Sequence, residues 1–241
     1  MIKDNVVLQF LNKMTDLFLL NALFLLCSLP IVTVGASLTS MYAVSLRSIR
    51  YGDGYIIKTF FKSFKQSFKQ ATLAWLLFLV FAVVLFVDYH FWQQVNMGTI
   101  SNTMKLVSVA IAFFVVMIFQ WLFPVIAKMQ DSFGRQIKNA AAMAVGYFVP
   151  YTLICMLLTF AVAYFVYTNV AAMVVMLMIG FSLITYVQSF FFYKVFAKFI
   201  DETPASDDDL LYSDKYRDKH NNENGIGNDK SKDEGIDNDN K

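Results

Sequence analysis

Glutamate, histidine and cysteine are nearly missing from the first 200 of the 241 residues. The first glutamate is Glu202, and the earlier part of the chain holds one histidine, His90, and two cysteines, Cys27 and Cys155. A metal site needs several histidine, cysteine or carboxylate ligands, and paired-carboxylate catalysis needs two acidic groups in one place. We therefore expect no metal, no cofactor and no glycosidase or metalloprotease activity.

Common catalytic motifs are absent too. The sequence contains no phosphate-binding loop of the GxxxxGK type, no GxSxG and no HExxH. The two cysteines lie in separate apolar runs and form no CxxC pair, so we expect small apolar side chains in helices. We predict no catalytic residues, and a membrane enzyme is the least favoured functional class.

Charged residues are missing from long stretches of the chain. Residues 17–46 and 139–193 contain no Asp, Glu, Lys or Arg, and 57% of the whole chain is apolar. Such runs are too apolar for a soluble domain, and a membrane-spanning helix needs about 20 apolar residues. We predict an all-α, polytopic membrane helical bundle of about five transmembrane helices. The predicted spans are residues 17–46, 71–92, 106–127, 139–167 and 170–193, with the last turn at Thr168–Asn169.

Three further segments complete the predicted organisation around a membrane domain of residues 17–200. Residues 1–16 have apolar residues at helical spacing, which predicts a short amphipathic helix on the membrane surface. Residues 55–70 are predicted to form a second, interfacial amphipathic helix. Residues 201–241 hold 6 basic and 13 acidic residues, against 14 and 5 before them, and form a predicted disordered acidic tail.

The first predicted span contains the candidate site. As one straight helix, residues 17–46 would measure about 45 Å, longer than a hydrocarbon core of about 30 Å, so we expect a helix tilted or broken at its proline. The break is either a hinge or binding site, or an ordinary proline kink whose freed carbonyl bonds a nearby hydroxyl; a re-entrant turn is the alternative geometry. Polar and small residues near the break form the candidate site: Asn21, Ser28, Pro30, Thr33 and Gly35.

A second candidate site is a stripe of lysines in the predicted interfacial helix. The spacing of four, three and four residues places these lysines on one helix face, with Ile57, Phe60, Phe61, Phe64 and Phe68 on an adjacent face. This pattern predicts aromatic rings in the acyl boundary and ammonium groups among lipid headgroups, and the flanking spans favour lipid over nucleic acid. The predicted headgroup-binding residues are Lys58, Lys62, Lys65 and Lys69.

Asp88 and His90 stand at the far end of the second predicted span. An ionisable pair near a membrane raises the hypothesis of a proton or cation site. The favoured interpretation is that both groups lie at headgroup level in an aromatic belt with Tyr89 and Trp92, because 18 uncharged residues precede Asp88 and suffice to cross the core.

Five spans would place the two termini on opposite sides of the membrane. Up to residue 200, three basic residues then lie on the N-terminal side and eleven on the other. The positive-inside rule therefore predicts a multi-pass protein of the cell membrane with its N-terminus outside and its C-terminal tail cytoplasmic. If Pro30 instead forms a re-entrant turn, the N-terminal helix lies on the cytoplasmic face.

Three stretches carry a family resemblance: LLNALFLLCSLPIVTVGAS at residues 19–37, FFKSFKQSFKQAT at residues 60–72, and FPVIAKMQDSFGRQIKNAA at residues 123–141. In order and spacing, they resemble the YesL family of bacterial integral membrane proteins, a family of unknown function found mostly in Gram-positive bacteria. The likeness covers roughly residues 5–200, and its first stretch is the most specific. The acidic tail has no counterpart.

The resemblance implies a role beside carbohydrate metabolism, because such proteins tend to be encoded near carbohydrate uptake and degradation systems. We expect a non-catalytic accessory or regulatory membrane protein, with the lipid bilayer and a sugar-transporter permease or other membrane protein as partners. The alternative is a small transporter or channel with its site at the broken first helix, a feature of transporter binding sites. Against that alternative, no inverted repeat is visible and ionisable groups are scarce.

Overall fold

The computed structural model describes residues 3–51, 56–95, 98–129 and 131–199, and the regular structure within these ranges is entirely helical. Helices are expected in lipid, because they satisfy every backbone polar group internally. The predicted all-α fold class is confirmed. The acidic tail, residues 201–241, lies outside the described residues. Four helices are long and apolar enough to cross a membrane: Phe10–Cys27, Ile56–Gln94, Thr99–Lys128 and Val170–Phe196.

Helices α1 (Lys3–Cys27) and α2 (Val34–Tyr51) form an antiparallel hairpin, joined by a turn that contains the short helix η1 (Ile31–Thr33). The Lys13 ammonium donates a hydrogen bond to Ser48 Oγ at 2.5 Å, so positions on either side of Pro30 lie next to each other. The expectation of one helix over residues 17–46 is therefore wrong, and the geometry is that of the re-entrant alternative. Residues 3–16 are likewise the start of α1 rather than a separate helix.

The turn follows from the chemistry of its proline. Pro30 has no N–H group to continue the helix and is extended, with φ −75° and ψ 116°. The chain therefore leaves α1 after Cys27 and re-enters helical conformation at Ile31.

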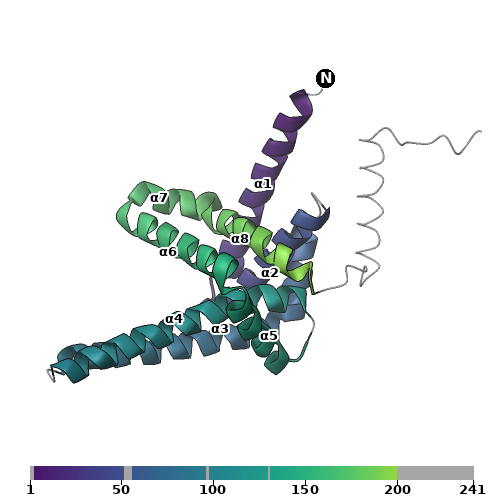
Figure 1. The fold of residues 1–241 in the computed structure, drawn as a ribbon. Helices are drawn as coiled ribbons and strands as arrows, with labels where there is room; N and C mark the ends of the chain where they lie inside the picture. The colour runs from purple at the N-terminus through teal and green to yellow at the C-terminus, as the bar shows by residue number, and fades with distance from the viewer. Residues whose placement is uncertain (1–2, 52–55, 96–97, 130, 200–241) are drawn as a thin grey trace, which may run out of the picture. The chain divides into compact units, whose positions relative to one another are not determined.

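Helix α3 (Ile56–Gln94) is continuous over 39 residues, which is about 58 Å of helix. The predicted interfacial helix, residues 55–70, and the predicted span, residues 71–92, are thus one rod, because no proline or glycine separates them. Gly98, with φ 57°, precedes α4 (Thr99–Lys128), which returns along α3. Figure 1 shows these two helices as a long hairpin.

The predicted span at residues 139–167 is also broken. Helix α5 (Phe133–Gly146) ends before the distorted segment η2 (Phe148–Thr152), and α6 (Leu153–Thr168) follows. Val149 has the extended angles φ −110° and ψ 120°, because a residue before proline disfavours the helical region, and Pro150 comes next. Asn169 then separates α6 from α7 (Val170–Val175), at the predicted turn, and η3 (Met176–Gly180) leads into α8 (Phe181–Phe196).

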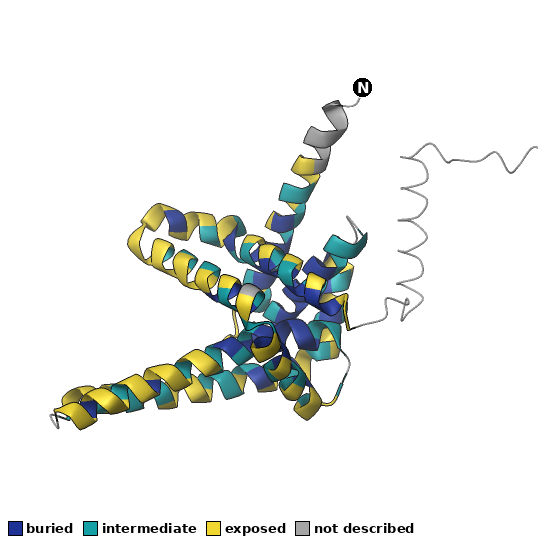
Figure 2. Cartoon of the chain, in the orientation of Figure 1, coloured by how far each residue is buried: buried dark blue, intermediate teal, exposed yellow. Residues whose placement is uncertain are grey.

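Buried residues concentrate where α1, α2, α3, α4 and α8 meet, and the far ends of the two long hairpins are exposed (Figure 2). Phe60 of α3 packs in a cluster with Leu20 and Phe24 of α1 and Met41 of α2. Exposed residues beyond this centre are mostly apolar. Such a surface suits hydrocarbon rather than water, so contact with a lipid bilayer follows from the fold.

Gly35 sets the closest approach between α2 and α3. A Cβ atom on this residue would lie 2.5 Å from Trp75 Cβ and would overlap the carbonyl oxygen of Ala71. Only glycine permits this separation of the two backbones, in the manner of small residues at membrane helix contacts.

We predict that Gly35→Ala destabilises the protein by about 1–3 kcal/mol, because the added methyl group forces α2 away from α3. The measurement is the unfolding midpoint of the purified protein in detergent. Gly134→Ala is the control, since a Cβ there meets no atom within 4 Å. Equal midpoints for the two variants would contradict the close contact.

Candidate functional site

The structure distributes the five predicted site residues over three places. Ser28, Pro30 and Thr33 lie at the tip of the α1–α2 hairpin, Gly35 lies against α3, and Asn21 lies against the α7–α8 segment. The five residues therefore form parts of one hairpin and its contacts rather than a single cluster. Their arrangement instead shows how one hairpin is closed and attached to the rest of the bundle.

Backbone groups at the hairpin tip are paired within the protein. Thr33 Oγ1 lies 2.6 Å from the Cys27 carbonyl oxygen and 2.7 Å from that of Pro30. The Trp75 indole N–H donates to the Ile31 carbonyl at 2.8 Å, tying the tip to α3. The Thr33 hydroxyl therefore satisfies carbonyls at the break, as the proline-kink interpretation expects. The apolar side chains of Leu29 and Ile31 remain 78% and 69% exposed.

Asn21 joins α1 to the irregular part of the last helix. Its amide Nδ2 donates to the Leu177 carbonyl at 2.7 Å, and its Oδ1 accepts from the Ser182 N–H at 3.1 Å. Leu177 belongs to η3, a π-helical turn, which differs in hydrogen bonding from the α-helix around it. Ser182 Oγ in turn donates to the Leu17 carbonyl at 2.7 Å, so the two helices exchange three hydrogen bonds.

A second polar centre joins α2, α6 and α8 and was not predicted. The Tyr42 hydroxyl donates to Gln188 Oε1 at 2.6 Å, and Gln188 Nε2 donates to Thr159 Oγ1 at 2.8 Å. Tyr42 and Gln188 are both buried. The arrangement is neutral, fixes three helices at one point and contains no pair of groups suited to acid–base chemistry.

The sequence does contain a signal for this centre. Polar residues of α8 recur on one face with helical spacing, and all of them are buried, together with Phe192. In lipid the polar face of a helix points toward the protein interior, the reverse of the pattern in water. The residues of this stripe are Ser182, Thr185, Gln188 and Ser189.

Two smaller polar contacts hold α4 and α5. The Trp121 indole N–H donates to Thr152 Oγ1 at 2.8 Å, so a side chain of α4 reaches the break between α5 and α6. Gln136 Nε2 donates to Gln70 Oε1 at 3.0 Å and to the Met129 carbonyl at 3.0 Å. These contacts, also unpredicted, attach α5 to α3 and to the end of α4.

The aromatic residues beside the lysine stripe divide between two environments. Phe60 is fully buried in the core, and Phe64 stacks on it with ring centroids 6.2 Å apart, whereas Phe61 and Phe68 are exposed. The expectation that the whole aromatic stripe lies in the acyl boundary is wrong, because α1 and α2 cover one side of it. Of the stripe lysines, Lys58, Lys65 and Lys69 are exposed and Lys62 is half-buried.

Asp88 is bonded inside the α3–α4 hairpin. Its carboxylate accepts hydrogen bonds from the Trp92 indole, at 3.2 Å, and from the Ser108 hydroxyl of α4. His90 is exposed and lies edge-on to Phe86, with ring centroids 4.4 Å apart. Within the described ranges, no group of three or more His, Cys, Asp or Glu lies close enough to hold a metal ion.

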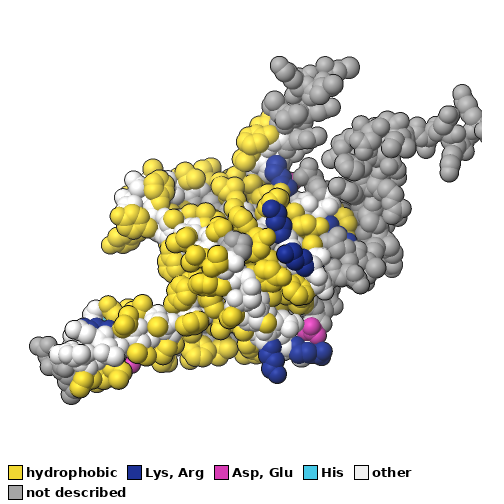
Figure 3. Space-filling view, in the orientation of Figure 1, with side chains coloured by type: hydrophobic (Ala, Val, Ile, Leu, Met, Phe, Trp, Pro, Cys, Tyr) yellow, Lys and Arg dark blue, Asp and Glu magenta, His cyan; other side chains and the backbone are white. Residues whose placement is uncertain are grey.

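Most of the basic side chains lie away from the hairpin ends, but Lys105 and Asp88 lie toward the free end of the α3–α4 hairpin. Figure 3 shows lysines and arginines over the end of α8 and the start of α5, with apolar side chains over most of both long hairpins. Exposed basic residues near the start of α5 and the end of α8 include Arg135, Lys138, Lys194 and Lys198. A basic surface is thereby separated from the apolar surface.

Residues 17–89 match the model of a family described as "Protein of unknown function, DUF624". No curated protein and no solved structure matches the chain. The matched segment contains the α1–α2 hairpin from Leu17, the Gly35 contact and α3 as far as Tyr89. This match is consistent with the resemblance of the first two sequence stretches, and its description assigns no activity.

We predict that Asn21→Leu destabilises the protein by about 1–2 kcal/mol, because it leaves the Leu177 carbonyl and the Ser182 N–H without their partner in an apolar interior. Unfolding in detergent measures the change. Thr15→Val serves as the control, since Thr15 is exposed and its hydroxyl bonds only to Leu11 of the same helix. A loss no larger than that of the control would show that the Asn21 contacts do not hold α1.

Proposed function

We propose that this protein is a non-catalytic accessory component of carbohydrate uptake, acting through contact with a sugar permease in the cell membrane. The observation that carries the proposal is the separation of its polar groups. Neutral polar side chains such as Asn21, Tyr42 and Gln188 pair with one another or with backbone at helix crossings, whereas lysine and arginine collect on the surface. The carbohydrate context comes from the family resemblance.

This separation favours a binding role over transport. A transport site needs polar groups that face a ligand, whereas Thr33 and Asn21 of the broken first helix bond to backbone carbonyls and to the α8 segment. Among the candidate residues of the break, Ser28 Oγ is enclosed without a hydrogen-bond partner. Exposed lysines such as Lys65, Lys69 and Lys138, by contrast, can meet an acidic surface of a partner or anionic headgroups, whereas Arg135 is paired with Asp131 at 3.3 Å. The lysine stripe extends this basic surface onto α3.

The proposed topology places both termini on the cytoplasmic side. The start of α1 and the end of α2 lie side by side, as the bond between Lys13 and Ser48 shows. The turn between the two helices contacts Trp75, near the start of the apolar part of α3. From Trp75 the helix continues for 19 residues to Gln94, about 28 Å, enough to cross most of the hydrocarbon core beyond the tip. The hairpin is therefore re-entrant, while α3 with α4, and α6 with α7–α8, cross.

This topology agrees better with the positive-inside rule than five spans do. Lys105 is then the one basic residue among the first 200 that lies outside, and the other 13 lie inside. The earlier expectation of an external N-terminus depended on α1 and α2 being one crossing helix.

A cysteine at Asn12 should be labelled by a membrane-impermeant thiol reagent only after the cells are permeabilised. Cysteines at Asn102 and Asn169, near the ends of the two crossing hairpins, should be labelled in intact cells. The background for all three is Cys27→Ala with Cys155→Ala. Labelling at position 12 in intact cells would show that the hairpin is not re-entrant.

Affinity purification from gently solubilised membranes should recover a sugar permease in stoichiometric amount. Lys65→Gln with Lys69→Gln should reduce this recovery several-fold, more so at low salt, because screening weakens surface charge contacts. Lys105→Gln, a charge change at the other end of the hairpin, is the control and should have no effect. If no permease is recovered and the purified protein instead moves sugar into liposomes, the accessory role is contradicted and the transporter alternative holds.

A further inference from the structure

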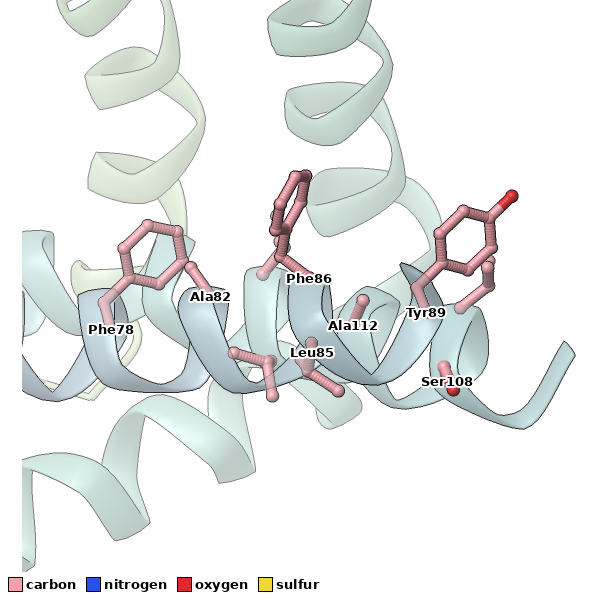
Figure 4. Close-up of a pocket in the computed structure, with 10 residues that line it drawn as sticks. Phe78, Ala82, Leu85, Phe86, Tyr89, Ser108 and Ala112 are labelled. Atoms are coloured by element: carbon pink, nitrogen blue, oxygen red, sulfur yellow. The ribbon is translucent and has the colours of Figure 1, made fainter. Parts of the chain in front are cut away.

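An apolar groove runs along the α3–α4 hairpin, away from every contact described above except that of Asp88. Its volume is about 290 Å³. Aromatic and β-branched side chains form its walls, and small residues on both helices form the hollow between them (Figure 4). The residues that define it are Phe78, Ala82 and Tyr89 of α3 and Ser108, Ala112 and Val116 of α4.

The groove is about half as long as the hydrocarbon core is thick. Phe78 and Tyr89 are eleven residues apart on a continuous helix, which is about 16 Å, and one leaflet contributes about 15 Å of hydrocarbon. Phe78 lies one turn beyond Trp75 and packs on Phe119, near the centre of the bundle. Tyr89 and Ser108 lie toward the free end of the hairpin. The groove therefore leads from the hairpin's outer end toward the bilayer interior.

Polar and charged groups stand only at the outer end of this groove. Ser108 donates to the Asp88 carboxylate, and the Trp92 indole bonds the same carboxylate. Lys105 is half-buried and lies three and four residues before Ser108 and Val109, so it projects from the face of α4 that lines the groove. At this end the Asp88 carboxylate is engaged by Ser108 and Trp92, and Lys105 is the cation that can pair with a phosphate group joined to an acyl chain.

We propose that this groove binds one phospholipid, with an acyl chain between Ala82 and Ala112 and the phosphate beside Lys105. The headgroup of the lipid lies at the free end of the hairpin. Asp88 is a positioning residue, because its bond to Ser108 joins α3 to α4 beside the groove, and Trp92 of α3 orients the same carboxylate. The site is independent of the lysine stripe, which lies at the opposite end of α3.

The probe is phosphatidylglycerol with a photoreactive group near the end of one acyl chain, added in equimolar amount to the full-length protein in detergent. Cross-links should map to residues 78–89 and 108–116. Ala112→Leu should reduce them at least tenfold, because the larger side chain fills the hollow. Ala110→Leu makes the same change on the exposed, opposite face of α4 and should leave them unchanged. The helical circular dichroism and unfolding midpoint of both variants establish that they are folded.

Lys105→Gln tests the contribution of the lipid headgroup to binding apart from that of the acyl chain. It should lower cross-linking by phosphatidylglycerol several-fold and leave that by a diacylglycerol with the same photoreactive chain unchanged. Cross-linking that is equal in Ala112→Leu and the original protein would overturn the proposal. If Ala112→Leu leaves lipid cross-linking intact but abolishes recovery of the permease, the groove accommodates a partner helix and the lipid site is likewise overturned. Failure of permease recovery in all variants bears on the accessory role alone.

Discussion

The structure depends on one constraint: polar groups within an apolar surrounding must find partners inside the protein. Asn21 accepts from one backbone N–H and donates to one backbone carbonyl on the two sides of a π-helical turn. The Thr33 hydroxyl lies within hydrogen-bond distance of two carbonyls at the proline break. Gln188 connects Tyr42 to Thr159. Each of these contacts joins segments far apart in sequence or closes a break, so polar residues specify where the helices meet while apolar residues face outward.

This use of polar residues bears on function. Side chains already engaged in holding helices are poor candidates for binding a solute, and what remains for interaction is the surface. The exposed surface is of two kinds: basic where lysine and arginine lie on α3, α5 and α8, and apolar over most of the hairpins. The proposed binding of a partner and of a lipid uses both kinds of surface.

Helix α3 connects the features of the chain that carry the two proposals. Its first turns bear the lysine stripe and pack on the α1–α2 hairpin, its middle contacts the hairpin tip through Trp75, and its last turns line the apolar groove. No proline or glycine interrupts the helix over these 39 residues, so the lysine stripe and the apolar groove lie on one continuous element.

The sequence by itself determined the helical class, the membrane surroundings, and the turn at Thr168–Asn169, because long uncharged runs have few other stable forms in lipid. It also identified Pro30 as a break and Asn21 as one of the polar residues near it. The tertiary structure decided that the break reverses the chain, that Phe60 is covered by α1 and α2, and that Tyr42 meets Gln188. Hydropathy measures only how a segment partitions between water and hydrocarbon. The direction after a break and the choice of partner depend on contacts between residues distant in sequence, 35 positions apart for Lys13 and Ser48 and 146 for Tyr42 and Gln188, and no local pattern encodes these.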